Sequence, residues 1–377
     1  MRILVDYRPA LRERTGVGEY IHQLARAYTG AYRDEVLLFT SSWKDRPAPN
    51  VAGQTGGRVI DRRIPVRILN YLWHRLEWPP AEMLAGSVDI THSAHPLLMP
   101  ARNAAQIVTI HDLFFLARMQ DTRAEIRRDY PVLAASHARR AHAVITSTQY
   151  GKSQIIERLG VAGERIYVCP PGAPVWRTLG RQPNVPSDGC ILFVGTLEPR
   201  KNVGALLDAY ERLLERRRQL PTLVLAGRGT AAASKWLARI NSAPLSGHVT
   251  HVGYVDEEAR EDLYRSARVL LMPSLDEGFG LPALEAMSAG VPVIVSTRGS
   301  LPEVVGDAGA QVDPTDVSAL ADAIERAVID RAWAMHAARA GLARARTFTW
   351  EQSARVLHRA YQEAVVSRTQ RVRAARA

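Results

Sequence analysis

Short apolar runs alternate with helix-length stretches along this chain, and no other feature restricts its fold as strongly. Each run is short enough to be a buried strand, and the stretch after it can form a helix. Strands that alternate with helices form parallel sheets with helices packed on their faces. The sequence therefore predicts an α/β fold. The expected strands are Ile3–Val5, Val36–Thr40, Asp89–His92, Ile107–His111, Ala143–Ser147, Ile191–Gly195, Thr222–Ala226, Val249–Val255, Val269–Pro273 and Val291–Ser296.

The chain has 377 residues, which suggests about two domains. A stretch rich in proline, glycine and polar residues begins at Ala173 and is typical of a linker. We expect a first domain over 1–172, a linker over 173–188 and a second domain over 189–345. The segment 346–377 is expected to hold one helix, opened by a capping box at Thr349, and a frayed basic tail. That tail carries Arg368, Arg371, Arg373 and Arg376.

Two glutamates flank a glycine-rich turn in the stretch 275–290. Seven residues separate Glu277 from Glu285, and Pro282 suits the first turn of a helix. We therefore expect Glu277 on a loop and Glu285 on the helix that follows. A strand, a glycine loop and a helix N-terminus favour an anion, whereas a carboxylate accepts two charge-assisted hydrogen bonds from a diol. A nucleotide sugar satisfies both preferences. The turn between the glutamates begins with Gly278, Phe279, Gly280 and Leu281.

A second candidate site follows the first strand of the second half. Arg200 and Lys201 stand immediately before a helix that runs through Arg218. Two cations and a helix N-terminus predict a diphosphate site, and Lys201 is placed to stabilise charge on a leaving oxygen. A cation at a helix N-terminus is unfavourable when no anion is bound. We therefore expect that removing Lys201 leaves the folded state intact.

The first half offers weaker candidates. The loop 14–18 contains Gly16 and Gly18, but Ile21 replaces the third glycine of a dinucleotide fingerprint. His111 and Asp112 end one predicted strand and His92 ends another, and ligands of parallel sheets bind beyond the carboxyl ends of strands.

Three segments carry a resemblance to a known family. They are PSLDEGFGLPALEAMSAGVPVIVS at 273–296, GTLEPRKN at 195–202 and VTIHDLFFL at 108–116. The chain resembles the family-four retaining glycosyltransferases, whose Glu-x7-Glu signature matches Glu277 and Glu285. The resemblance implies the GT-B fold, in which two Rossmann-like parallel-sheet domains face a cleft. The family has Gly-Arg where this chain has Gly195-Thr196, so we assign the role of that arginine to Arg200.

The resemblance also implies a role for each candidate. Glu277 and the backbone at Phe279 and Gly280 would contact the sugar, and Glu285 would contact the ribose hydroxyls. The backbone near Tyr254 and Val255 would border the base. The loop with Gly16 and Gly18 would approach the diphosphate and the acceptor, and His111 with Asp112 would reach the sugar or the acceptor.

The implied reaction is hexosyl transfer with retention of configuration and without a metal ion or cofactor. No Asp-x-Asp metal signature occurs in the chain. No carboxylate can be assigned as a nucleophile, so we expect the leaving phosphate to deprotonate the acceptor. The segments resemble mannosyl- and rhamnosyltransferases of bacterial surface-polysaccharide and lipopolysaccharide synthesis, and GDP-mannose is the preferred donor. Alternatives are a UDP-, dTDP- or GDP-rhamnose-type donor, a sugar-nucleotide epimerase or hydrolase, and a non-catalytic nucleotide-binding scaffold.

A formal charge of +11 allows nucleic acid, an anionic membrane or a polyanionic substrate as partner. No basic-aromatic motif of a nucleic-acid module is present, so we expect no nucleic acid. The acceptor is expected to be a glycan or a lipid-linked glycan. The two cysteines lack disulfide or metal-ligand spacing, which fits the cytoplasm. The protein is then either free there or peripheral on the inner face of a membrane.

Residues 64–78 predict an amphipathic helix. Its apolar face would hold Ile68, Leu69, Leu72, Trp73 and Leu76, and nearby arginines would supply charge. Either this face packs on its own domain or the helix touches anionic lipid. We expect packing.

Overall fold

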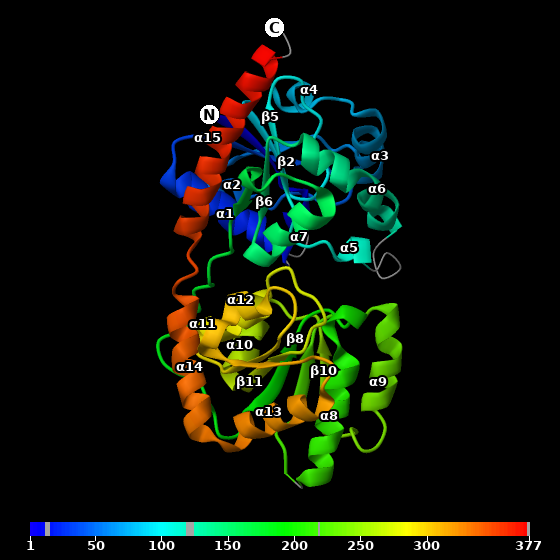
Figure 1. Cartoon of the computed structure of the whole chain (residues 1–377), viewed down its shortest axis with the longest axis vertical. Helices are drawn as coiled ribbons and strands as arrows, with labels where there is room; N and C mark the ends of the chain where they lie inside the picture. Colours follow the sequence, from blue (N-terminus) through cyan, green and yellow to red (C-terminus); the bar gives the residue numbers. More distant parts are fainter. Residues whose placement is uncertain (12–15, 118–123, 218, 375–377) are drawn as a thin grey trace. The chain divides into compact units, whose positions relative to one another are not determined.

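The computed structural model describes residues 1–11, 16–117, 124–217 and 219–374. The chain forms two compact units. Unit 1 joins Met1–Gly172 to Thr349–Ala377, and unit 2 is Ala173–Phe348. Each unit contains its own sheet and its own layers of helices (Figure 1).

Unit 1 is built on a seven-stranded sheet with the order β3-β2-β1-β4-β5-β6-β7. All neighbouring strands are parallel. The order reverses between β1 and β4, and this reversal defines a switch point at which open α/β sheets bind ligands. The strands are β1 (Arg2–Asp6), β2 (Glu35–Thr40), β3 (Arg58–Asp61), β4 (Ile90–Ser93), β5 (Ala105–Thr109), β6 (Ala143–Thr146) and β7 (Ile166–Val168).

Successive side chains of these strands point to opposite faces of the sheet, so each strand feeds two cores. Val5 of β1 packs under α1 (Val17–Ala31) and α15 (Trp350–Ala374). Its neighbour Leu4 packs on the other face with α3 (Val66–Tyr71) and α4 (Ala81–Ala85). Figure 1 shows α15, in red, lying along α1. The remaining helices of unit 1 are α2 (Val51–Thr55), α5 (Phe114–Ala117), α6 (Ala124–Arg140) and α7 (Gln149–Leu159).

Unit 2 repeats this topology with six parallel strands in the order β10-β9-β8-β11-β12-β13. Its switch point lies between β8 and β11. The strands are β8 (Cys190–Val194), β9 (Leu223–Ala226), β10 (Val249–Gly253), β11 (Ala267–Met272), β12 (Val293–Ser296) and β13 (Ala310–Val312). One face is covered by α8 (Val203–Arg216), α9 (Ser234–Ile240) and α13 (Val317–Ile329). The other is covered by α10 (Glu257–Ser266), α11 (Leu281–Ala289), α12 (Leu301–Val305) and α14 (Arg331–Ala345).

The predicted α/β fold of two parallel sheets is confirmed, but two segments differ from their predictions. The expected linker packs on unit 2, where Trp176 donates to Ser288 Oγ at 2.8 Å and Thr178 donates to Glu261. The expected frayed tail is helical, because α15 continues to Ala374 and Arg371 donates to the carbonyl of Arg140 at 3.0 Å. Arg376 lies outside the described residues. Over the described ranges, no helix combines the length and the apolarity that crossing a membrane requires.

Candidate active site

The loops that follow β8 and β11 meet at the switch point of unit 2. The two strands are neighbours in the sheet, so their carboxyl ends lie side by side. The backbone N–H of Leu275 donates to the carbonyl of Arg200 at 2.7 Å and ties the loops together. Arg200 and Lys201 end a short 3-10 turn, and Asn202 follows in the left-handed conformation at φ 57°. Asparagine tolerates this conformation better than most residues.

Glu277 is the centre of a buried ionic cluster in these loops. Its Oε1 accepts hydrogen bonds from the ammonium of Lys201 and from Ser274 Oγ, the latter at 2.9 Å. Its Oε2 accepts from Arg200 Nη1 at 3.0 Å. The side chains of Glu277 and Lys201 are 6% and 8% exposed. Arg200 also donates from Nε to Glu198 at 2.6 Å, so two cations face two carboxylates.

The charges in this cluster control the protonation of Glu277. Burial alone raises the pKa of the Glu277 carboxyl, but the charges of Lys201 and Arg200 outweigh it and hold the pKa at about 2. Burial also lowers the pKa of the Lys201 ammonium, against the attraction of Glu277. The carboxylate is therefore ionised at neutral pH and acts as a hydrogen-bond acceptor.

Two expectations about these residues need correction. The sequence predicts that Lys201 is an unfavourable cation at a helix N-terminus when no anion is bound, but Glu277 is its counter-charge in the structure. The expectation that its removal leaves the fold intact therefore loses its physical basis. Glu277 was also expected to offer its oxygens to a diol. Three of the roughly four acceptor positions of a carboxylate are used within the protein, which leaves about one at Oε2.

Glycine backbone forms the surroundings of Lys201. A Cβ on Gly195 would lie 3.7 Å from Lys201 Nζ, so the β8 turn runs directly beside the ammonium. A Cβ on Gly227 would lie 1.9 Å from the carbonyl oxygen of Gly195, and only glycine allows the β8 and β9 turns to approach this closely. At this point the site therefore consists of the Gly195 and Gly227 backbone and the Lys201 ammonium, because neither glycine has a side chain that would fill the space.

Glu285 lies on α11, as predicted, and is held by the preceding helix. Tyr264 of α10 donates from its hydroxyl to Glu285 Oε2 at 2.8 Å, and Arg260 Nε lies 3.6 Å from the same oxygen. Tyr264 is fully buried, so its hydroxyl is fixed in place. Gly280 precedes α11 with φ +93°, and a Cβ there would lie 2.4 Å from Leu301 Cδ2.

The remaining candidates of unit 2 occupy the same carboxyl edge. The Phe279 ring is buried against Phe348 at 5.7 Å between centroids, which leaves only its backbone for a ligand. Gly278, Leu281 and Val255 are half-buried. Tyr254 is 41% exposed after β10, and the Arg228 guanidinium lies 4.9 Å from its ring centroid.

The candidates from the first half of the chain lie in unit 1. Gly16 caps α1 with φ +45°, and a Cβ on Gly18 would lie 2.7 Å from the carbonyl oxygen of Pro9. Arg14 and Thr15 lie outside the described residues. Asp112 Oδ1 accepts from the backbone N–H of Phe114 at 3.2 Å.

His111 follows β5, and its ring lies edge-on to Tyr20 with the centroids 5.1 Å apart. Burial lowers the pKa of His111 to about 4, with Asp112 opposing it, so the imidazole is neutral at pH 7. Its Nε2 is buried and has no hydrogen-bond partner among the described residues. A buried nitrogen without a partner is unfavourable, so a ligand or water at this position would stabilise it.

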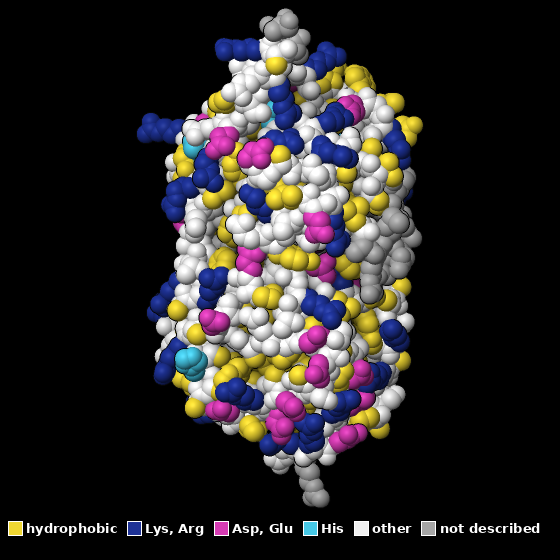
Figure 2. Space-filling model, viewed as in Figure 1, with side chains coloured by type: hydrophobic (Ala, Val, Ile, Leu, Met, Phe, Trp, Pro, Cys, Tyr) yellow, Lys and Arg dark blue, Asp and Glu magenta, His cyan; other side chains and the backbone are white. Residues whose placement is uncertain are grey.

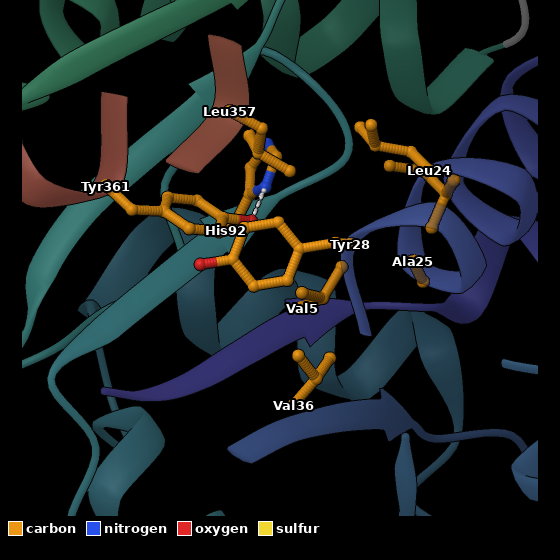
Figure 3. Close-up of a pocket in the computed structure, with 9 residues that line it drawn as sticks. Val5, Leu24, Ala25, Tyr28, Val36, His92, Leu357 and Tyr361 are labelled. Carbon is orange, nitrogen blue, oxygen red and sulfur yellow. Dashed lines mark hydrogen bonds between the residues drawn. The ribbon is translucent and has the colours of Figure 1, made fainter. Parts of the chain in front are cut away.

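His92 is a structural residue and does not face a ligand. Its Nδ1 and Nε2 lie 2.7 Å from the Tyr361 and Thr109 hydroxyls, and burial lowers its pKa to about 3. Figure 3 shows its bond to Tyr361 beside a small cavity between the sheet, α1 and α15. The cavity volume of about 10 Å³ is close to the minimum for one water. The expectation that His92 faces a ligand is wrong.

Sequence reasoning missed another polar cluster, which lies at the switch point of unit 1. Arg8 binds Asp6 through two hydrogen bonds of 2.8 Å and binds Asn70 at 2.9 Å. His95 Nε2 lies 3.3 Å from Asp6 Oδ2. Asp6 is fully buried; burial raises its pKa, but Arg8 and His95 outweigh this and leave it well below its usual range. The only sequence signal was a charged pair at a strand end.

The two repeated parallel sheets and the ionic cluster at a strand-end switch point define an α/β protein with a candidate ligand site in unit 2. Comparison with known families is more specific. Residues 14–177 match the model described as Glycosyltransferase Family 4, and residues 179–344 match the one described as Glycosyl transferases group 1. The chain belongs to glycosyltransferase family 4 and is a glycosyltransferase.

Similar proteins agree with this assignment. The chain is 32% identical to the O-antigen chain mannosyltransferase B of Escherichia coli, over 93% of this chain and 97% of that protein. It is 28% identical to a D-inositol 3-phosphate glycosyltransferase of Thermobifida fusca, over 95% and 91% of the two chains. Among solved structures, a sucrose-phosphate synthase of Thermosynechococcus elongatus has a TM-score of 0.77 at 23% identity, covering 97% of this chain and all of the other. This structural neighbour supports the predicted GT-B fold.

Proposed function

We propose that this protein is a retaining hexosyltransferase that moves mannose from GDP-mannose to a glycan or lipid-linked acceptor in cell-surface polysaccharide synthesis. The observation that carries the proposal is the Lys201–Arg200–Glu277 cluster at the unit 2 switch point. The choice of mannose is supported by the similarity to the mannosyltransferase of O-antigen synthesis over nearly the whole chain. The polysaccharide context has the same support.

The cluster suits a diphosphate leaving group. One of the three N–H groups of the Lys201 ammonium is used by Glu277, and the others can donate to phosphate oxygens. Arg200 adds a second positive charge, and the backbone of Gly195 allows close approach. Charge on the leaving oxygen grows during bond cleavage, so these fixed donors stabilise the transition state more than the bound donor.

Glu277 and Glu285 would bind different hydroxyl groups of the donor. The one acceptor position left at Glu277 Oε2 would take a single sugar hydroxyl, and its main task would be to hold Lys201 and Arg200 in place. Glu285, oriented by Tyr264, would accept from the ribose hydroxyls. The exposed ring of Tyr254 and the backbone at Val255 would border the base.

Retention and metal independence belong to the same proposal. Lys201 and Arg200 are fixed hydrogen-bond donors that would stabilise the leaving phosphate directly, so the proposal requires no metal ion or cofactor. The leaving phosphate would take the acceptor proton on the same face of the sugar, which retains the configuration without a covalent intermediate. His111 would contribute as a neutral hydrogen-bonding group to the donor sugar or the acceptor.

The acceptor and the location complete the proposal. We place the enzyme in the cytoplasm, peripheral to the inner face of a membrane where a lipid-linked acceptor would be found. The charge of +11 favours an anionic surface. Nucleic acid is not proposed as a partner.

A ligand panel and a product analysis test the proposal. At equal concentrations, GDP-mannose should raise the melting temperature more than UDP-, dTDP- or ADP-sugars, because stabilisation grows with the ratio of ligand concentration to Kd. A ligand at 100 times its Kd adds about 2.7 kcal/mol to stability. With an acceptor glycan, the new glycosidic bond should have the anomeric configuration of the donor. Turnover with water alone, an epimerised donor, or binding without turnover would replace the proposal by a hydrolase, an epimerase or a scaffold, respectively.

A further inference from the structure

Trp176 lies in the stretch 173–188, which was predicted as a linker, and contacts the two helices that hold Glu285. Its indole Nε1 donates to Ser288 Oγ of α11 at 2.8 Å. Its ring packs on the ring of Tyr264 of α10, with 5.4 Å between the two centroids. One side chain from outside both helices therefore touches α10 and α11 together.

Both partners of Trp176 also bind Glu285. The Tyr264 hydroxyl donates to Glu285 Oε2 at 2.8 Å, so this partner holds the carboxylate. Ser288 Oγ donates to the backbone carbonyl of Glu285 at 2.8 Å, so this partner holds the main chain. A hydroxyl can donate once and accept twice, and Ser288 therefore bonds to Trp176 and to Glu285 at the same time. Tyr264 and Ser288 are buried, so solvent competes little for these contacts.

The rest of the stretch 173–188 binds the same two helices. Glu261 of α10 is buried and accepts from the backbone N–H and the hydroxyl of Thr178 at 2.9 and 2.8 Å. Asn184 donates from Nδ2 to the carbonyl of Tyr264 at 2.8 Å. The backbone N–H of Asn184 donates to the carbonyl of Gly290, directly after α11, at 2.8 Å. This stretch therefore holds α10 and α11 against each other.

Such support affects binding because a diol requires the carboxylate in one orientation. A glutamate side chain that rotates freely loses conformational entropy when it binds, and this loss weakens binding. A side chain that the protein already holds avoids most of the loss. Tyr264 holds the carboxylate of Glu285, and Trp176 packs on the ring that carries the Tyr264 hydroxyl. The effect of Trp176 should therefore appear in the affinity for the ribose hydroxyls.

We propose that Trp176 is a positioning residue for the donor nucleotide, which keeps Tyr264 and Ser288 in place so that Glu285 can accept from the ribose hydroxyls. The inference rests on the proposed function, which assigns these hydroxyls to Glu285. It gives a role to a side chain that acts through its two partners and not by contact with the donor.

Calorimetric binding of GDP and of 2′,3′-dideoxy-GDP to the full chain tests the proposal. The wild type should bind the dideoxy analogue on the order of 10²-fold more weakly, because the analogue lacks two hydrogen bonds to a carboxylate. Trp176→Ala removes the ring and the donor, and should reduce this ratio by on the order of 10-fold. Trp176→Phe keeps a ring on Tyr264 and should reduce it less. The affinity for the analogue itself should stay close to that of the wild type, which a merely structural role would not predict.

Ser288→Ala provides a second, independent variant. It removes the acceptor of the Trp176 hydrogen bond and leaves the indole in place. It should reduce the ratio about as much as Trp176→Phe does, and the double variant should change little further, because both changes remove the same bond. In turnover, both single variants should raise the donor KM and keep kcat close to that of the wild type. These two variants suffice if melting curves show that Trp176→Ala does not fold.

Trp236→Phe is the matched control, because it makes the same substitution in the same unit on the other face of the sheet. Trp236 of α9 is buried and packs with side chains of α8 and α13. Figure 2 shows acidic and basic side chains close together over this part of unit 2, where Arg216 of α8 pairs with Asp322 of α13. The control should lose stability and keep the wild-type ratio of the two affinities.

The outcomes separate this inference from the proposed function. A wild type that binds GDP and its dideoxy analogue equally would remove the ribose contact of Glu285 from the proposed function, and the role of Trp176 with it. A wild type that discriminates, with Trp176 variants that discriminate equally well or lose both ligands alike, would overturn the role of Trp176 alone. If UDP binds and GDP does not, UDP and its dideoxy analogue give the same comparison, and only the choice of GDP fails. Absence of binding by both nucleotides would overturn the function and the inference together.

Discussion

Glu277→Gln is the sharpest test of the ionic cluster, because it removes one charge and nearly preserves the shape of the side chain. In the folded chain, Lys201 and Arg200 would then face each other without the carboxylate between them. Removing one partner of a buried pair typically costs about 3–5 kcal/mol. We therefore expect the variant to be less stable than the wild type at neutral pH.

The pH dependence of this difference follows from the pKa of Glu277. The folded value is about 2 and the ordinary value is 4.5. Between these values the unfolded chain binds a proton that the folded chain does not. The stabilisation is therefore complete above the ordinary pKa and is lost as the pH falls through about 2. The difference between 4.5 and about 2 corresponds to about 3 kcal/mol, of which about 2 kcal/mol is lost by pH 3.

Urea unfolding of the wild type and the variant at pH 7, 5, 4 and 3 measures this loss. The difference between their free energies of unfolding should shrink by about 2 kcal/mol from pH 7 to pH 3. Other carboxyls titrate equally in both proteins and cancel. Glu215→Gln, which changes an exposed glutamate of α8, should give a curve parallel to that of the wild type. A difference that stays constant to about 0.5 kcal/mol would show that Lys201 and Arg200 do not hold Glu277 ionised.

Three further predictions concern activity. Lys201→Ala should lower kcat by on the order of 10²-fold or more and lower the melting temperature, because Glu277 loses a buried counter-charge; Lys201→Arg should restore kcat only in part. Near-normal kcat would remove Lys201 from the active site. Glu285→Ala should raise the donor KM more than it lowers kcat, and Tyr264→Phe should do so more weakly; a collapse of kcat at constant KM would contradict the ribose contact. EDTA should leave transfer rates unchanged, and a loss that magnesium or manganese reverses would require a metal-dependent mechanism.

The sequence predicted the fold because its signals are local. Apolar runs such as Val269–Pro273 have strand length, and Pro282 and the glycines around it specify the start of α11. The positions of Glu277 on a loop and Glu285 on a helix followed from these signals. Both positions are as predicted, whereas the contacts of the two side chains within the protein were not predicted.

Contacts between distant segments could not be predicted. Lys201 and Glu277 are 76 positions apart, and only the adjacency of β8 and β11 brings them together. Tyr264 contacts Glu285 from another helix, and no periodic pattern in the sequence indicates this contact. The sequence also missed the exposure of Ile68 and Leu76, which are 53% and 59% exposed although we expected them on a packed helix face. Periodicity shows which residues share a face but not how much of that face a neighbour covers.

The position of α15 in unit 1 has a consequence for the order in which the chain matures on the ribosome. One face of the unit 1 sheet is covered partly by Leu357 and Tyr361, which are translated long after β1–β7. At 5–20 residues per second, the stretch between the two parts of unit 1 takes roughly 10–40 s to synthesise. Unit 2 is contiguous and can close first. A released chain that ends after position 348 should therefore resist protease over unit 2 while its amino-terminal half remains cleavable, and that half would need protection from aggregation until α15 is added.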